Sequence, residues 1–108
     1  MAALDFSTTT TLPALDNVTT GAANVLQQIK LPLGDHCRIS LYFRTNPGKV
    51  VFSGTDGGAL GAADYLTIPA DAWHEIHNGS ARDRKGVTSI YVTSATASTV
   101  VELLIEGA

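Results

Sequence analysis

The sequence predicts an all-β domain, a sandwich or barrel of about seven to eight short antiparallel strands. Three observations favour this class. Apolar and polar residues alternate in short runs that have the length of a strand, and turn residues separate these runs. No stretch long enough to form a helix repeats its apolar residues with the period of a helix. With 108 residues the chain is expected to form one domain around one core.

Residues 1–23 differ from the rest of the chain. An unbroken threonine run at 8–11 is followed by Leu12 and Pro13, and β-branched residues next to proline disfavour a helix. We therefore expect an extended arm over 1–23 and a β-sandwich domain over 24–108. Such an arm would need a neighbour to lie on, and its removal is expected to leave the fold intact.

The clearest predicted strand covers residues 36–45, where Cys37, Ile39, Leu41 and Phe43 alternate with polar side chains. Further strands are expected at 25–31, 49–53, 65–68, 72–77, 89–94 and 99–106. The stretch 65–79 contains the only tryptophan and is expected to lie at the centre of the domain. Within it, Pro69 should end its strand or place it at an edge.

Two loops are predicted from composition. Residues 54–63 include four glycines, which favours a flexible loop of the kind that often has a function. Residues 80–86 are charged. Both loops are expected to project from the sandwich.

The charge of the chain indicates which kinds of partner it can have. A net charge of −3 argues against nucleic acid, whose binding depends on neutralising phosphates. Charged residues make up only 16% of the chain, which suggests that a partner covers part of the surface. The outer face of residues 99–106 is half apolar through Val100 and Leu104, which suggests the same.

Cys37 is the single cysteine, so no internal disulfide is expected. No apolar run has the length of a membrane helix, and the N-terminus lacks a basic segment typical of a signal peptide.

The residues that could carry chemistry do not form a recognisable set. His74 and His77 are three apart, so on one strand they would face opposite sides and could not easily share a metal ion. No nucleophile or phosphate-binding motif is present. We therefore expect no catalytic residue, no metal and no cofactor, and a protein that is not an enzyme.

Trp73 has three possible roles: a core residue, an interface anchor, or a platform on which a sugar ring stacks. Core or interface is the commoner use of a lone tryptophan.

Residues 24–106 resemble small virion proteins of tailed bacteriophages. The resemblance is carried by the run LQQIKLP, the strand CRISLYF, the glycine-rich link after VVFSG, and the segments YLTIPADAWHEI, SIYVTSAT and VVELLIE. It implies a jelly-roll sandwich and a protein that decorates or cements the capsid, or lies at the neck or tail. No functional residue can be carried over from it.

The resemblance and the composition together predict a capsid decoration protein that binds the major capsid protein or other virion subunits. It is expected to be made in the host cytoplasm, to reside on the capsid surface and to be a homotrimer, without nucleic-acid or membrane partners. The predicted interface residues are Thr8, Thr9, Thr10, Thr11, Leu12, Pro13, Trp73, Val100 and Leu104. The alternative is a carbohydrate- or receptor-binding module that uses Trp73, Tyr65 or Tyr91 together with the glycine-rich loop.

Overall fold

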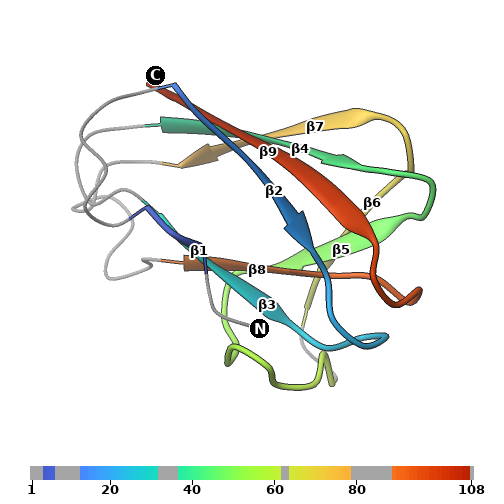
Figure 1. The fold of residues 1–108 in the computed structure, drawn as a ribbon. Coiled ribbons are helices and arrows are strands. Elements are labelled where there is room, and N and C mark those ends of the chain that lie inside the picture. Colours follow the sequence, from blue (N-terminus) through green and yellow to red (C-terminus); the bar gives the residue numbers. More distant parts are fainter. Residues whose placement is uncertain (1–3, 7–12, 32–36, 62–63, 79–88, 108) are drawn as a thin grey trace.

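The protein is a sandwich of two β-sheets (Figure 1). The computed structural model describes residues 4–6, 13–31, 37–61, 64–78 and 89–107, and within them it contains nine strands and no helix. The five-stranded sheet has the order β1 (Leu4–Asp5), β3 (Gln27–Lys30), β8 (Ser89–Thr93), β5 (Gly48–Val51) and β6 (Leu66–Ile68). The four-stranded sheet has the order β2 (Ala14–Thr19), β9 (Val100–Gly107), β4 (Cys37–Phe43) and β7 (Trp73–Asn78). The predicted all-β sandwich is therefore confirmed.

The strand order is that of a jelly roll. The strands pair antiparallel as β2 with β9, β3 with β8, β4 with β7 and β5 with β6. The chain is thus one long hairpin, folded between β5 and β6, and its successive pairs alternate between the two sheets. One strand departs from the antiparallel expectation, because β1 runs parallel to β3 at the edge of the five-stranded sheet.

The core lies between the sheets and follows the alternation of the sequence. Ile39, Leu41 and Phe43 of β4 are fully buried, and so are the inward-facing residues of β9, which are Val101, Leu103 and Ile105. Because strands β4 and β9 are neighbours, these two rows form one continuous apolar layer. The side chain of Cys37 lies outside the described part of the structure.

The N-terminal region belongs to the sandwich, which corrects the predicted division at residue 23. Residues 14–19 are extended, as expected, but β2 pairs with β9 over its whole length, and Val18 is only 4% exposed in the core. Phe6 is also buried in the same core. The sequence pattern concealed this strand, because Val18 is the only large apolar residue of β2 that faces inward while Leu15 faces outward.

The stretch 65–79 is peripheral, contrary to the expectation that it lies at the centre. Strands β6 and β7 are edge strands, one in each sheet, and the chain crosses between the sheets at the corner after Pro69. The prediction for Pro69 is confirmed, since β6 ends at Ile68 and forms an edge. Edge strands tolerate proline and need only one buried face.

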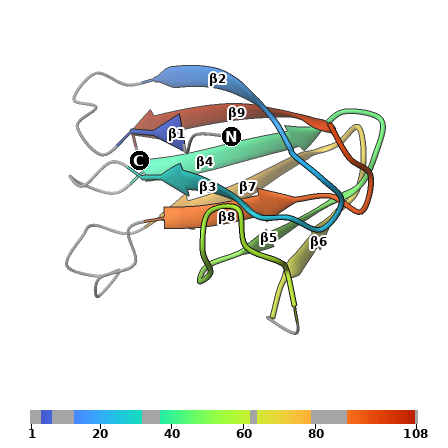
Figure 2. The ribbon, with the colours of Figure 1, turned by 60° about the horizontal axis from the view of Figure 1, so that its bottom comes forward.

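The glycine-rich loop packs onto the five-stranded sheet and, within the described residues 54–61, does not project. The amide of Leu26 donates to the carbonyl of Gly58 at 2.8 Å, and the amide of Leu60 donates to the carbonyl of Asn24 at 2.9 Å. Leu60 thereby joins Leu26, Val51 and Tyr91 in a small second core on the outer face of this sheet. The backbone of the loop follows β5 in Figure 2. The apolar side chains on that face need a cover, and the loop supplies it. Residues 62–63 and the predicted loop at 80–86 lie outside the described residues.

Candidate functional site on the four-stranded sheet

The outer face of the four-stranded sheet gathers side chains from all its strands. Register places Tyr42 of β4 between Trp73 of β7 on one side and Glu102 of β9 on the other. Asn17 of β2 lies opposite Glu102, so a row of four side chains crosses the whole sheet. This row mixes aromatic, acidic and amide groups, unlike the apolar inner face.

Exposed Trp73 and half-buried Tyr42 form an aromatic pair on this face. Their ring centroids are 5.3 Å apart and the rings are tilted by 50°, a favourable geometry for two aromatic rings. Trp73 is 55% exposed. This exposure excludes a core role for Trp73 and leaves an interface anchor or a ligand platform.

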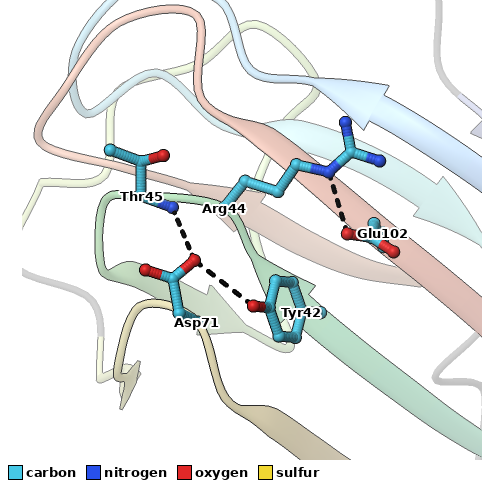
Figure 3. Close-up of polar contacts among 5 residues, drawn as sticks. All are labelled: Tyr42, Arg44, Thr45, Asp71 and Glu102. Carbon is cyan, nitrogen blue, oxygen red and sulfur yellow. Dashed lines mark hydrogen bonds and ion pairs between the residues drawn. The ribbon is translucent and has the colours of Figure 1, made fainter.

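Asp71 holds Tyr42 in place (Figure 3). The Tyr42 hydroxyl donates to Asp71 Oδ1 at 3.3 Å, and the Thr45 amide donates to the same oxygen at 3.0 Å. Asp71 itself has a positive φ of 57° in the turn before β7, a conformation that aspartate tolerates better than most residues. Its amide donates to the carbonyl of Phe43 at 2.8 Å, which anchors the turn to β4.

The same environment raises the pKa of the Tyr42 phenol above its ordinary value of 10.0. Desolvation is the main cause, and the negative charge and hydrogen bond of Asp71 add to it. The phenol therefore stays protonated and remains a hydrogen-bond donor throughout the neutral pH range.

Arg44 and Glu102 form an ion pair on the same face as Tyr42, whose register partner on β9 is Glu102 (Figure 3). Arg44 Nε donates to Glu102 Oε2 at 2.8 Å, and both side chains are partly exposed. Exposed pairs of this kind add little to stability. The ion pair orients the two side chains, so that a hydrogen-bond donor and an acceptor lie next to each other on the outer face.

A shallow hollow of about 540 Å³ opens between the aromatic pair and β2. Its wall includes a tryptophan, two leucine side chains on the outer face, one carboxylate, one guanidinium and one amide. Asp16 pairs in register with the inward-facing Leu103, so its side chain belongs to the other face of the sheet. The lining residues are Leu15, Asp16, Asn17, Arg44, Trp73, Glu102, Leu103 and Leu104. Leu15 is 77% exposed. Such a site can combine an apolar contact with several hydrogen bonds.

The predicted interface residues are only partly described. Trp73 and Leu104 line this hollow, Val100 is half-buried, and Pro13 is exposed. Thr8, Thr9, Thr10, Thr11 and Leu12 lie outside the described residues. Sequence reasoning missed Leu15, Asn17 and Arg44 as neighbours of Trp73, because only the pairing of β2, β9, β4 and β7 brings them together.

A second exposed patch lies at the edge of the five-stranded sheet. Phe52, Tyr65 and Leu66 are 47%, 47% and 43% exposed, and they line a small hollow of about 140 Å³ with Val50 and Asp64. Lys49 Nζ lies 4.6 Å from the centre of the Tyr65 ring, within the range of a cation–π contact. We call Phe52, Tyr65 and Leu66 the edge patch.

The three aromatic residues predicted as alternative sugar platforms, Trp73, Tyr65 or Tyr91, lie in different parts of the structure. Tyr91 is buried beneath the glycine-rich loop, and Tyr65 belongs to the edge patch of the other sheet. The aromatic partner of Trp73 is Tyr42, which sequence reasoning did not select.

Within the described ranges, no three histidine, cysteine, aspartate or glutamate residues are grouped so that they could hold a metal ion. His74 of β7 is half-buried and pairs with Leu41 of β4. The side chain of His77 lies outside the described part of the structure. No helix long and apolar enough to cross a bilayer occurs in the part of the chain that the structure describes.

Comparison with known proteins leaves the family open. No family model matches the sequence, and no curated protein matches it. A solved structure described as "Bacillus endospore appendages form a novel family of disulfide-linked pili" is similar over 87% of this chain and 82% of its own, with 14% sequence identity and a TM-score of 0.49. A likeness at that level carries no argument about what this chain does.

Proposed function

We propose that the protein is a non-enzymatic structural component of a phage virion, a decoration protein that binds the major capsid protein or a neighbouring virion subunit. The resemblance of residues 24–106 to phage virion proteins suggests a virion subunit as the partner. The jelly-roll strand order agrees with the fold that this resemblance implies. The observation that carries the proposal is the edge patch, a cluster of large apolar side chains left open to solvent at a sheet edge.

The edge patch has the character of the centre of a protein interface. Soluble monomers seldom expose several adjacent large apolar residues, and interface centres are rich in aromatic residues and poor in charge. Lys49 and Asp64 flank the patch. The partner surface should therefore be apolar at its centre, with a carboxylate placed to meet Lys49.

We place the contact with the capsid shell at the edge patch instead of at the predicted interface residues Trp73, Val100 and Leu104. The hollow beside Trp73 contains the charged side chains of Arg44 and Glu102, and charges at an interface centre must be desolvated at a cost that pairing does not always offset. The three side chains of the edge patch carry no charge, and its neighbours Lys49 and Asp64 lie beside it, where the rim of an interface could leave them in water. Contacts made by Thr8 to Pro13 remain a prediction of the same proposal.

Reconstitution with phage heads tests this function. Heads purified from a phage that encodes the chain, but with its gene deleted, are mixed with wild-type protein, with Leu66→Asp, or with Ala97→Asp as a control on the exposed loop before β9. Wild type and Ala97→Asp should sediment with the heads, whereas Leu66→Asp should lose about tenfold or more in affinity because it buries an unpaired charge. If the wild-type protein does not bind heads, capsid decoration is contradicted. If it binds only to purified necks or tails, it is a component of that part of the virion instead.

The homotrimer is part of this proposal and is tested separately. Light scattering after size exclusion should give three times the chain mass, either in solution or for protein released from heads. A monomer in both preparations contradicts the trimer but leaves the shell contact to the reconstitution.

A further inference from the structure

We propose that the hollow on the outer face of the four-stranded sheet binds a neutral saccharide, with Trp73 as the stacking platform. This inference goes beyond virion attachment, since it uses a different sheet and different residues from the edge patch. It rests on the kinds of groups that line the hollow, on their fixed positions, and on the balance of their charges.

The first element is a preorganised aromatic surface. Trp73 lines the hollow and is more than half exposed, so its ring is available to a ligand. The axial C–H groups of a pyranose ring form an apolar patch that stacks on the electron-rich face of an indole. Tyr42 contacts the indole at 5.3 Å between centroids, and Asp71 in turn holds Tyr42, so the platform is braced before a ligand arrives.

The second element is a set of polar groups that suits hydroxyls. A sugar hydroxyl both donates and accepts hydrogen bonds. Glu102 offers acceptors, Arg44 offers donors, and the Asn17 amide offers both. The ion pair between Arg44 Nε and Glu102 Oε2 at 2.8 Å fixes two of these groups relative to one another.

The third element is charge, which decides the ligand class. The carboxylate of Glu102 opposes an anionic ligand, and the guanidinium of Arg44 opposes a cationic one, which would otherwise suit a tryptophan beside an acid. A neutral ligand with many hydroxyls satisfies donors and acceptors without meeting a repulsive charge. The volume of about 540 Å³ lies within the usual range of small-molecule sites and accommodates a short oligosaccharide.

Trp73 is the only tryptophan, so its fluorescence reports on this site directly. The wild-type protein is titrated with neutral oligosaccharides of glucose, N-acetylglucosamine, mannose, galactose and xylose, each to about 10 mM. At least one should give a saturable shift with a dissociation constant between about 10 µM and 1 mM, the range expected for a shallow site with one stacking ring. Sialyllactose and choline, as anionic and cationic probes, should give none.

Variants assign the binding to the hollow. Calorimetry with the oligosaccharide that binds best should give about a tenfold or greater loss for Trp73→Ala and a smaller loss for Asn17→Ala. Tyr65→Ala removes an equally prominent exposed aromatic residue from the edge patch and should bind like the wild type. Unchanged circular dichroism of Trp73→Ala would separate lost binding from lost folding.

Three results overturn the inference: no neutral oligosaccharide binds, a charged probe binds more tightly than every neutral one, or Trp73→Ala binds as well as the wild type. If the Trp73 fluorescence instead responds to virion subunits and to no sugar, the face is a protein contact. Because reconstitution with heads depends on the edge patch, the two proposals fail independently of each other.

Discussion

At the scale of single residues, the pair Thr20 and Thr99 shows how one hydroxyl can support a buried connection. The Thr99 amide donates to Thr20 Oγ1 at 3.0 Å, and the Thr20 amide donates to the Thr99 carbonyl at 2.9 Å, with both residues buried. Thr20→Val keeps the shape but leaves a buried amide without its acceptor, so the free energy of unfolding should fall by about 1–3 kcal/mol. Urea denaturation measures this, and the exposed Thr19→Val is the control. Equal midpoints for the two variants would contradict the assignment.

The titration of Tyr42 is a second test at this scale. Desolvation and Asp71 raise the pKa of its phenol above 10.0. For a group whose pKa is raised on folding, the stabilising contribution is present below the unfolded value and is lost as the pH rises through the folded value. The tyrosinate absorbance that Tyr42→Phe removes should therefore appear at higher pH than in a peptide. Asp71→Asn should move it down part of the way, since desolvation remains, and an unchanged titration would be evidence against the Asp71 contact.

At the scale of elements, the glycine-rich loop acts as a cover for strand β8. Every residue of β8 is buried, because the core packs on one face and the loop packs on the other. Leu60→Ala should lower the free energy of unfolding by about 2 kcal/mol and speed hydrogen exchange of the Gly57 and Leu60 amides, which donate to Leu26 and Asn24. Leu66→Ala, a truncation of the same size at an exposed site, should cost less than about 1 kcal/mol. Equal losses would mean that the loop is not a cover.

At the scale of the whole molecule, the N-terminal region decides whether the sandwich closes. Removing residues 1–23 deletes β1 and β2, takes Phe6 and Val18 from the core, and exposes the edge of β9. The truncated chain should lose cooperative thermal unfolding, rather than keep its fold as an arm would allow. Val18→Asp should be severely destabilised, whereas Thr19→Asp, exposed on the same strand, should not be. A cooperative transition in the truncated chain would restore the view of a separate arm.

Much of the fold was predictable because alternation determines which side chains face inward. The inward rows of β4 and β9 and the end of β6 at Pro69 all follow from local patterns. The same patterns did not identify β2 as part of a sheet or the loop at 54–61 as a cover. In both cases the evidence lay in a distant partner: β9 for the strand and the outer face of β8 for the loop.

The candidate site was predictable only through Trp73 and Leu104. The remaining residues around the hollow come from β2, from β9 and from Arg44 just after β4, and no local spacing connects Asn17 with Arg44 or Glu102. Their proximity depends on register between strands that are far apart in the chain, and a shift by one residue would turn these side chains inward.

Local sequence patterns specify the class of fold, the inward face of each central strand and the positions of most turns, because these depend on neighbours one to four residues away. The jelly-roll pairing, the edge positions of β6 and β7 and the hollow beside Trp73 follow from the packing of the whole chain. A period of two specifies which face of a strand is buried but not which strand lies next to it. That choice is made by packing and hydrogen bonding across the whole chain, and the site exists only after it has been made.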